Sequence, residues 1–71
     1  MQTLIHVRFS PDGAVTEIGA RPQGVEPQSW FNYLSRAAGN AYQALSGGRG
    51  LFRLESEELD GLKDGFAKLA A

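Results

Sequence analysis

The turn sequence Ser10-Pro11-Asp12-Gly13 most constrains the fold, because it separates two short segments of strand-forming composition. Proline presets φ in such a turn and glycine accepts a positive φ, so the four residues favour a chain reversal. The preceding segment, Leu4 to Phe9, is rich in β-branched and aromatic residues, as strands usually are. We therefore expect a β-hairpin whose strands cover about residues 3–9 and 14–20.

The alternation of side chains predicts the register of this hairpin. Arg8 is expected opposite Glu17 and Val7 opposite Ile18, because a slip of one residue would bury a charge. His6, Arg8 and Glu17 then share the polar face. The expected apolar face consists of Ile5, Val7, Phe9, Thr16, Ile18 and Ala20.

A long amphipathic helix is predicted over about residues 28–45. Pro27 suits its first turn, where a missing N–H does no harm. Gly39 lies in its middle and is expected to cost about 1 kcal/mol relative to alanine. At ~100° per residue, one apolar stripe forms. Its members are Trp30, Phe31, Leu34, Ala38, Ala41, Tyr42 and Leu45.

The glycine-rich segment Gly47-Gly48-Arg49-Gly50 is expected to end this helix, since glycine readily takes the left-handed turn at a C-terminus. A third strand then covers about residues 51–55. Ser56 is a suitable N-cap for a second helix over about 57–70, with Glu57 and Glu58 near the positive end of its dipole. The apolar stripe of this helix is Leu59, Leu62, Phe66 and Leu69.

The element order β-β-α-β-α predicts one small α+β domain over residues 1–71. The first strand is the most apolar and is expected at the centre, with the third strand antiparallel beside it after a right-handed crossover. The result is a three-stranded, mainly antiparallel sheet of order 2-1-3 with both helices on one face. The other face, with His6, Arg8, Glu17 and Arg53, is expected to be open to solvent or to a partner.

Composition excludes several kinds of site. The chain has no cysteine and one histidine, so disulfides and Cys- or His-based metal centres are excluded, and we expect no cofactor. The first residues do not resemble a signal peptide, and the apolar runs are far too short to span a membrane. Absence of cysteine is compatible with a reducing compartment. We expect a soluble, cytoplasmic protein without a membrane partner.

No catalytic constellation is recognisable, and we do not expect an enzyme. His6 is the one side chain that titrates near neutral pH when unperturbed, but it has no assigned acid partner beyond Glu17. The acids from Glu55 to Asp60 match no calcium-loop spacing and suit helix capping instead.

Weak basic features leave two binding hypotheses open. Net charge is −1, but residues 1–54 carry +2 and residues 55–71 carry −3. Gly47 to Gly50 satisfies the G-x-x-G spacing of KH domains, although the strand expected after it does not fit that context. Arg36, Arg49 and Arg53, with Tyr33, could form a small basic-aromatic patch suited to phosphate or to a protein partner.

No motif assigns the chain to a family. In size and outline alone it resembles the products of short phage and prophage reading frames, many of which bind and block one host protein. We therefore predict a non-enzymatic protein–protein interaction module, which binds a partner or self-associates as a homodimer. The alternative is weak nucleic-acid binding through the Gly47–Arg53 region. The predicted partner-binding residues are His6, Arg8, Glu17, Tyr33, Arg36, Arg49 and Arg53.

Overall fold

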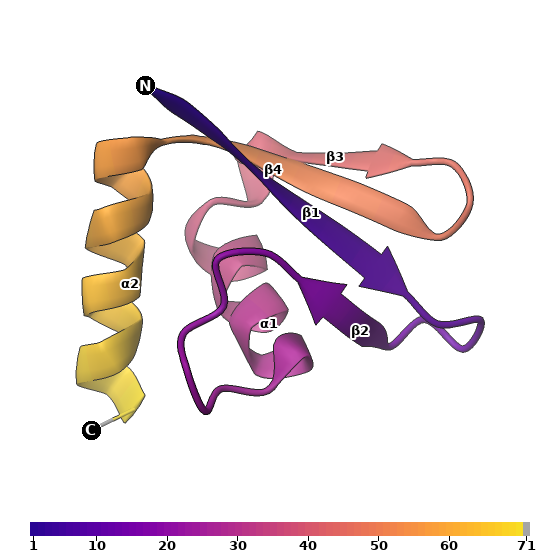
Figure 1. The fold of residues 1–71 in the computed structure, drawn as a ribbon, viewed down its shortest axis with the longest axis horizontal. Coiled ribbons are helices and arrows are strands. Elements are labelled where there is room, and N and C mark those ends of the chain that lie inside the picture. The colour runs from indigo at the N-terminus through magenta and orange to yellow at the C-terminus, as the bar shows by residue number, and fades with distance from the viewer. Residues whose placement is uncertain (71) are drawn as a thin grey trace.

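A computed structural model of the chain describes residues 1–70, and of Ala70 only the backbone. The prediction of an α+β chain with an antiparallel sheet and two helices is confirmed (Figure 1). The predicted domain range of 1–71 ends on a residue outside the described part. In chain order the elements are β1 (Gln2–Phe9), β2 (Val15–Ile18), α1 (Pro27–Ala37), the 3-10 helix η1 (Gly39–Ala41), β3 (Tyr42–Leu45), β4 (Arg49–Glu55) and α2 (Ser56–Ala70).

The sheet has the order β2-β1-β4-β3, and every neighbouring pair is antiparallel. Its centre is the pair β1–β4, which is in register from Gln2 opposite Glu55 to Arg8 opposite Arg49. The predicted order 2-1-3 describes β2, β1 and β4. The prediction of three strands was wrong, because a fourth strand, β3, extends the sheet beyond β4.

The predicted helix over residues 28–45 was wrong beyond Ala37. Pro27 does open α1, but the chain leaves the helix at Ala38, which has φ −142° and ψ 38°. Glycine and asparagine, which follow at 39 and 40, have low helix propensity. The backbone groups of Tyr42–Leu45 find partners in β4 instead, so tertiary pairing overrides a helical pattern.

The glycine-rich segment is a hairpin turn, not a helix end. Gly47 and Gly48 have φ of +77° and +70°, which side chains other than glycine rarely adopt, and they let β3 return as β4. The carbonyl of Gly48 also accepts a hydrogen bond of 2.8 Å from the Phe9 backbone N–H. The two hairpins are therefore tied together where β1 ends.

The ring of Tyr42 leaves no room for a side chain at position 50, which is glycine. A Cβ at this position would lie 2.2 Å from the Tyr42 hydroxyl and 2.7 Å from two ring carbons. The ring is held by Phe52 and Phe31, with centroid separations of 5.1 and 5.9 Å. Tyr42 thus covers a buried glycine on the neighbouring strand and joins the β3–β4 hairpin to the core.

The first hairpin keeps the predicted pairs of Arg8 with Glu17 and Val7 with Ile18. A bulge then shifts the register, so that Phe9 lies opposite Val15 and Val15 is buried in place of the predicted Thr16. The prediction that β2 runs from 14 to 20 was also wrong. The strand ends at Ile18, and Ala20 turns the chain with φ +58°.

In the turn of this hairpin, the Asp12 carboxylate accepts hydrogen bonds from the Ser10 hydroxyl and the Ala14 backbone N–H. These bonds favour the charged form and hold the pKa of Asp12 below its ordinary value of 3.8. The aspartate of the turn sequence therefore stabilises the loop through its charge.

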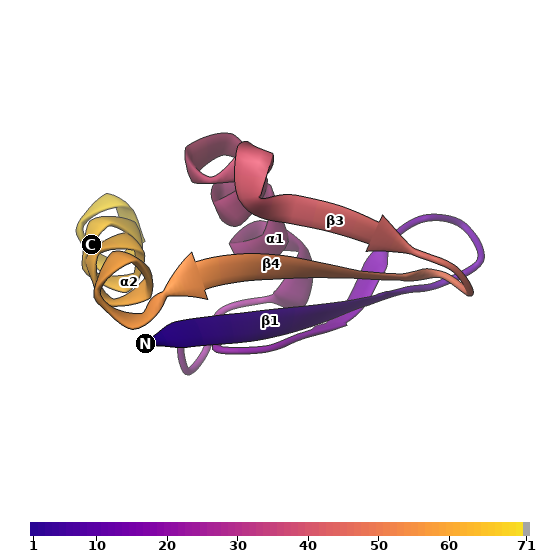
Figure 2. The same cartoon turned by 90° about the horizontal axis from the view of Figure 1, so that it is seen from above.

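The core lies on one face of the sheet, between the strands and both helices (Figure 2). Trp30 of α1 is fully buried, and its indole N–H donates to the Gly19 carbonyl at 3.2 Å. Leu59 brings α2 into the same core, whereas Leu69 is 74% exposed and so does not extend the predicted stripe. The buried cluster is Ile5, Val7, Val15, Ile18, Trp30, Leu34, Ala38, Phe52, Leu54 and Leu59.

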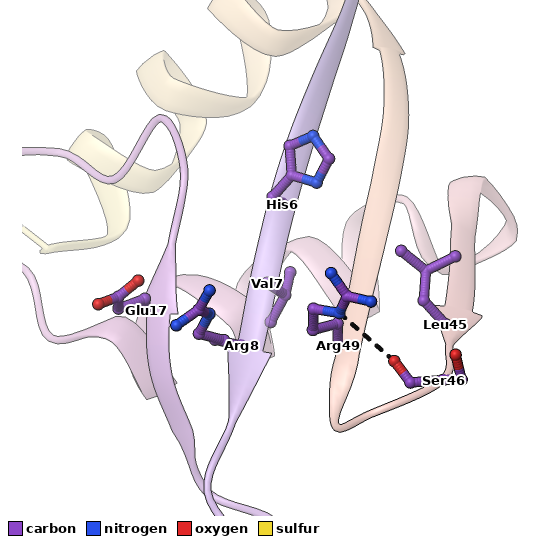
Figure 3. A pocket seen from close by; sticks show the side chains of 7 residues that line it. All are labelled: His6, Val7, Arg8, Glu17, Leu45, Ser46 and Arg49. Atoms are coloured by element: carbon purple, nitrogen blue, oxygen red, sulfur yellow. Dashed lines mark hydrogen bonds between the residues drawn. The ribbon is translucent and has the colours of Figure 1, made fainter.

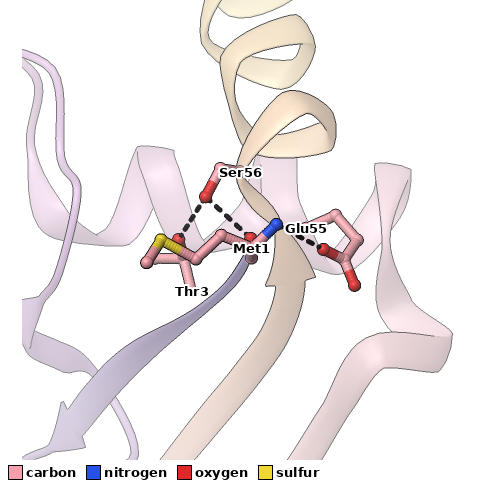
Figure 4. Close-up of polar contacts among 4 residues, drawn as sticks. All are labelled: Met1, Thr3, Glu55 and Ser56. Carbon is pink, nitrogen blue, oxygen red and sulfur yellow. Dashed lines mark hydrogen bonds and ion pairs between the residues drawn. The ribbon is translucent and has the colours of Figure 1, made fainter.

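Ser56 is the first residue of α2 and does not act as the predicted N-cap. Its hydroxyl donates to the Met1 carbonyl at 2.7 Å, and its backbone N–H donates to the same oxygen at 2.8 Å (Figure 4). Thr3 Oγ1 lies 3.1 Å from the Ser56 hydroxyl, and the Met1 amine lies 3.2 Å from Glu55. These contacts fix the start of α2 to β1.

Candidate functional site

The face of the sheet opposite the helices is the candidate functional site, and we call it the open face. Neither helix lies over it, because both contribute their buried side chains to the other face. Side chains alternate along each strand, so the pairing of the strands determines which residues belong to it. They are Gln2, Leu4, His6 and Arg8 of β1, Glu17 of β2, Gln43 and Leu45 of β3, and Arg49, Leu51, Arg53 and Glu55 of β4.

The structure brings together five of the residues predicted to bind a partner. His6, Arg8, Glu17, Arg49 and Arg53 share the open face, and all five are exposed. Their gathering depends on the central position of β1 and its pairing with β4, both of which the sequence predicted.

The other two predicted residues, Tyr33 and Arg36, lie on α1 and do not join that group. Tyr33 is half-buried, stacks on Trp30 at 5.9 Å and meets Phe66 at 5.1 Å. Its hydroxyl would lie 2.6 Å from a Cβ at Gly65, so it packs closely against α2. Arg36 is exposed in the last turn of α1. The structure therefore does not assemble a single basic-aromatic patch.

Two arginines face each other at one end of the open face, on the two middle strands of the sheet. Arg8 and Arg49 are directly opposite on β1 and β4. Arg8 has Glu17 on its other side, but Arg49 has Leu45, so Arg49 lacks an acidic cross-strand neighbour. Within residues 1–70, neither guanidinium comes within 4 Å of a carboxylate. Like charges directly opposite each other are destabilising, on the scale of the roughly 0.2–1 kcal/mol that cross-strand pairs contribute relative to an alanine pair.

This arginine pair lines a hollow of about 490 Å³ (Figure 3). Arg8 lies on the side of Glu17, and Arg49 lies on the side of Leu45. The Nε of Arg49 donates to the Ser46 carbonyl at 3.4 Å, which tethers that side chain to the β3–β4 turn. The hollow is open to solvent and lies within the 300–1,000 Å³ typical of ligand sites.

A second hollow of about 460 Å³ continues the first along β1 and shares His6 and Glu17 with it. Its wall includes Leu4, which is 49% exposed and lies opposite Arg53. Leu45 borders the first hollow and is half-buried. The open face therefore combines positive charge with exposed apolar surface, as protein interfaces often do.

Leu4, Gln43, Leu45 and Leu51 belong to the open face but were not predicted to bind a partner. The sequence carried a signal for Leu4, since it alternates with Ile5 and lies two residues before His6, on the polar side of β1. Gln43 and Leu45 could be placed only once β3 was known to be a strand.

All tryptophan, tyrosine and phenylalanine side chains of the chain belong to the helix-covered face. Trp30 and Phe52 are fully buried, and the remaining aromatic residues pack against the same cluster. The His6 imidazole is therefore the one ring that the described open-face residues offer for stacking on a nucleic-acid base. The residues packed around the cluster are Phe9, Phe31, Tyr33, Tyr42 and Phe66.

In the part of the chain that the structure describes, no three His, Cys, Asp or Glu side chains are grouped closely enough to hold a metal ion. No helix there combines the length and apolar character needed to cross a membrane. Among known proteins, no family model matches the chain, and no curated protein or solved structure matches it.

Proposed function

We propose that this protein is a non-enzymatic module that binds another protein through its open face. The observation that carries the proposal is the Arg8–Arg49 pair on the two middle strands of an uncovered sheet surface. Repulsion between the two charges destabilises the free protein, and an anionic group from a partner would offset that repulsion. Exposed Leu4 and half-buried Leu45 add apolar area on the same face.

A protein partner suits this surface better than nucleic acid. Single-stranded nucleic acid is held by aromatic stacking together with phosphate contacts, and here every tryptophan, tyrosine and phenylalanine ring packs on the other face. Glu17 and Glu55 also interrupt the positive charge along the open face. Weak nucleic-acid binding through Gly47–Arg53 remains the alternative, because Arg49 and Arg53 are exposed, and it would weaken steeply with salt.

The resemblance to phage and prophage products favours one kind of partner. Short phage and prophage proteins, which it resembles in size and outline, often act by binding one host protein. A host protein is then the partner that the proposal implies. We place this interaction in the cytoplasm, since a cysteine-free chain is compatible with a reducing compartment.

Self-association through β3 is a second mode of binding. β3 is an edge strand, and its four residues, Tyr42–Leu45, include no charge and no proline, the usual protections of an edge. The opposite edge is partly occupied, because the Val15 backbone N–H donates to Gln28 of α1 at 2.9 Å. An added strand is therefore expected at β3 rather than at β2.

Affinity capture from cell extract with paired variants tests the proposed function. Leu4→Asp places a charge on the open face, and Leu69→Asp makes the same change at an exposed leucine of α2. We expect one protein to be captured by wild type and by Leu69→Asp and lost with Leu4→Asp. Equal capture by the two variants, with both folded, would refute a role for the open face.

A further inference from the structure

We propose that the hollow around Arg8 and Arg49 binds a carboxylate side chain, so that the partner presents an acidic protein segment to the open face. This inference rests on the proposed function and specifies the chemistry of the partner. The positive charge of Arg49 supports it, because Arg49 lies between Arg8 and Leu45 and has no acidic neighbour across either strand.

The two guanidinium groups have N–H donors available for a ligand. An arginine presents five N–H donors in a planar fork, and this fork matches the two oxygens of a carboxylate. Among residues 1–70, the Arg49 side chain has one hydrogen bond, from Nε to the Ser46 carbonyl, and that bond leaves its terminal nitrogens available. Arg8 makes no ion pair within the same range. The donors therefore suit an oxyanion from outside the chain.

The geometry allows both arginines to reach one ligand. Directly opposed residues on antiparallel strands have Cβ atoms about 4.5–5.5 Å apart, so two long side chains there can converge on one group. Both line the same hollow of about 490 Å³, which is large enough for a side chain. Figure 3 shows His6 further along β1 on the same side.

The surroundings favour a protein carboxylate over a phosphate backbone. Glu17 lines the hollow and would repel a continuous run of phosphates, whereas one carboxylate can bind beside Arg49 at the far wall. Leu45 borders that wall and offers apolar contact to the residue next to the carboxylate in a peptide. The best-matched segment thus alternates acidic and apolar residues.

The test is an NMR titration of the ¹⁵N-labelled protein with a capped peptide of alternating glutamate and leucine. The matched peptide has glutamine in place of glutamate, and inorganic phosphate and a mixed-sequence single-stranded oligonucleotide serve as other anions. We expect the glutamate peptide to shift the amides of Arg8, Arg49 and Leu45, and the glutamine peptide to leave them in place. Equal shifts with both peptides, or no shifts with either, would overturn the carboxylate assignment.

Charge variants separate a specific site from general attraction. Arg49→Gln and Arg8→Gln should each weaken binding of the glutamate peptide about tenfold, and Arg36→Gln, which removes the same charge from α1, should not. Arg49→Lys keeps the charge but loses the fork, and it should fall between wild type and Arg49→Gln. Equal weakening by Arg36→Gln would overturn the inference. Well-dispersed spectra establish that each variant is folded.

Other outcomes identify a different occupant. Tighter binding of the oligonucleotide at the same residues would mean that the ligand is nucleic-acid phosphate and not a carboxylate. Binding of phosphate alone would indicate a small anion. Shifts that grow with protein concentration and without peptide would make the acidic surface of a second copy the occupant. Failure of the peptide while Leu4→Asp still abolishes capture would refute this inference and leave the proposed function standing.

Discussion

Gly50→Ala tests the β3–β4 hairpin, on which the position of Arg49 and Leu45 depends. The added Cβ would lie 2.2 Å from the Tyr42 hydroxyl and 2.7 Å from two atoms of its ring. The phenolic oxygen is fixed in the plane of the ring, so the whole ring must move. Phe31 and Phe52 hold that ring by edge and tilted contacts, so it has little room.

The expected cost follows from overpacking a well-packed site. Such changes typically destabilise a protein by about 1–3 kcal/mol. In a Tyr42→Leu background the clashing atoms are absent, and alanine then gains about 0.5–1 kcal/mol over glycine inside a strand. The effect of Gly50→Ala should therefore change sign, with a coupling energy of about 1.5–4 kcal/mol between the two positions. Tyr42→Phe keeps the ring atoms, and in that background Gly50→Ala should remain destabilising.

Urea unfolding followed by Trp30 fluorescence measures these free energies. The buried indole makes this signal sensitive to the loss of the core. If Gly50→Ala stabilises the protein equally in all three backgrounds, Tyr42 does not cover Gly50 and the hairpin is not arranged as described. Such a result would favour the helix that the apolar spacing of residues 42–45 suggests.

Three further predictions concern charge and assembly. Arg49→Gln should stabilise the free protein by about 0.2–1 kcal/mol in urea unfolding, less at high salt, because it removes repulsion from Arg8; a loss of stability would refute this repulsion. Since the folded pKa of Asp12 is depressed, its contribution to stability is present above pH 3.8 and lost as the pH falls through the folded pKa. The unfolding free energies of wild type and Asp12→Asn should therefore converge in acid, and a constant gap would contradict the turn hydrogen bonds. Ala44→Lys should abolish any concentration-dependent dimer in sedimentation analysis, and a dimer that persists would not be formed through β3.

Much of the fold could be predicted because local signals agree with tertiary packing. The turn at residues 10–13 and the alternation around it predicted the first hairpin and the Arg8–Glu17 pair. The same alternation placed His6, Arg8, Glu17 and Arg53 on the open side of the sheet. These residues are the part of the candidate site that the sequence could supply.

The second hairpin was missed because its apolar residues also fit a helical stripe. Ala41, Tyr42 and Leu45 continue the spacing of Trp30 and Leu34, and periodicity alone cannot separate the two forms in so short a segment. Gly47-Gly48 between two short apolar runs is a hairpin signal that could have decided the matter. Because β3 was not predicted, the position of Leu45 opposite Arg49 could not be predicted either.

Photo-crosslinking from the open face is the most direct test of the central claim that this surface contacts a partner. A photoreactive residue at Gln43, exposed beside Leu51 on the open face, is compared with one at Ser35, exposed on α1. We expect one discrete protein adduct from position 43 in cells that produce the protein, and none from position 35. An adduct from position 35 alone, or the same adducts from both positions, would contradict the account.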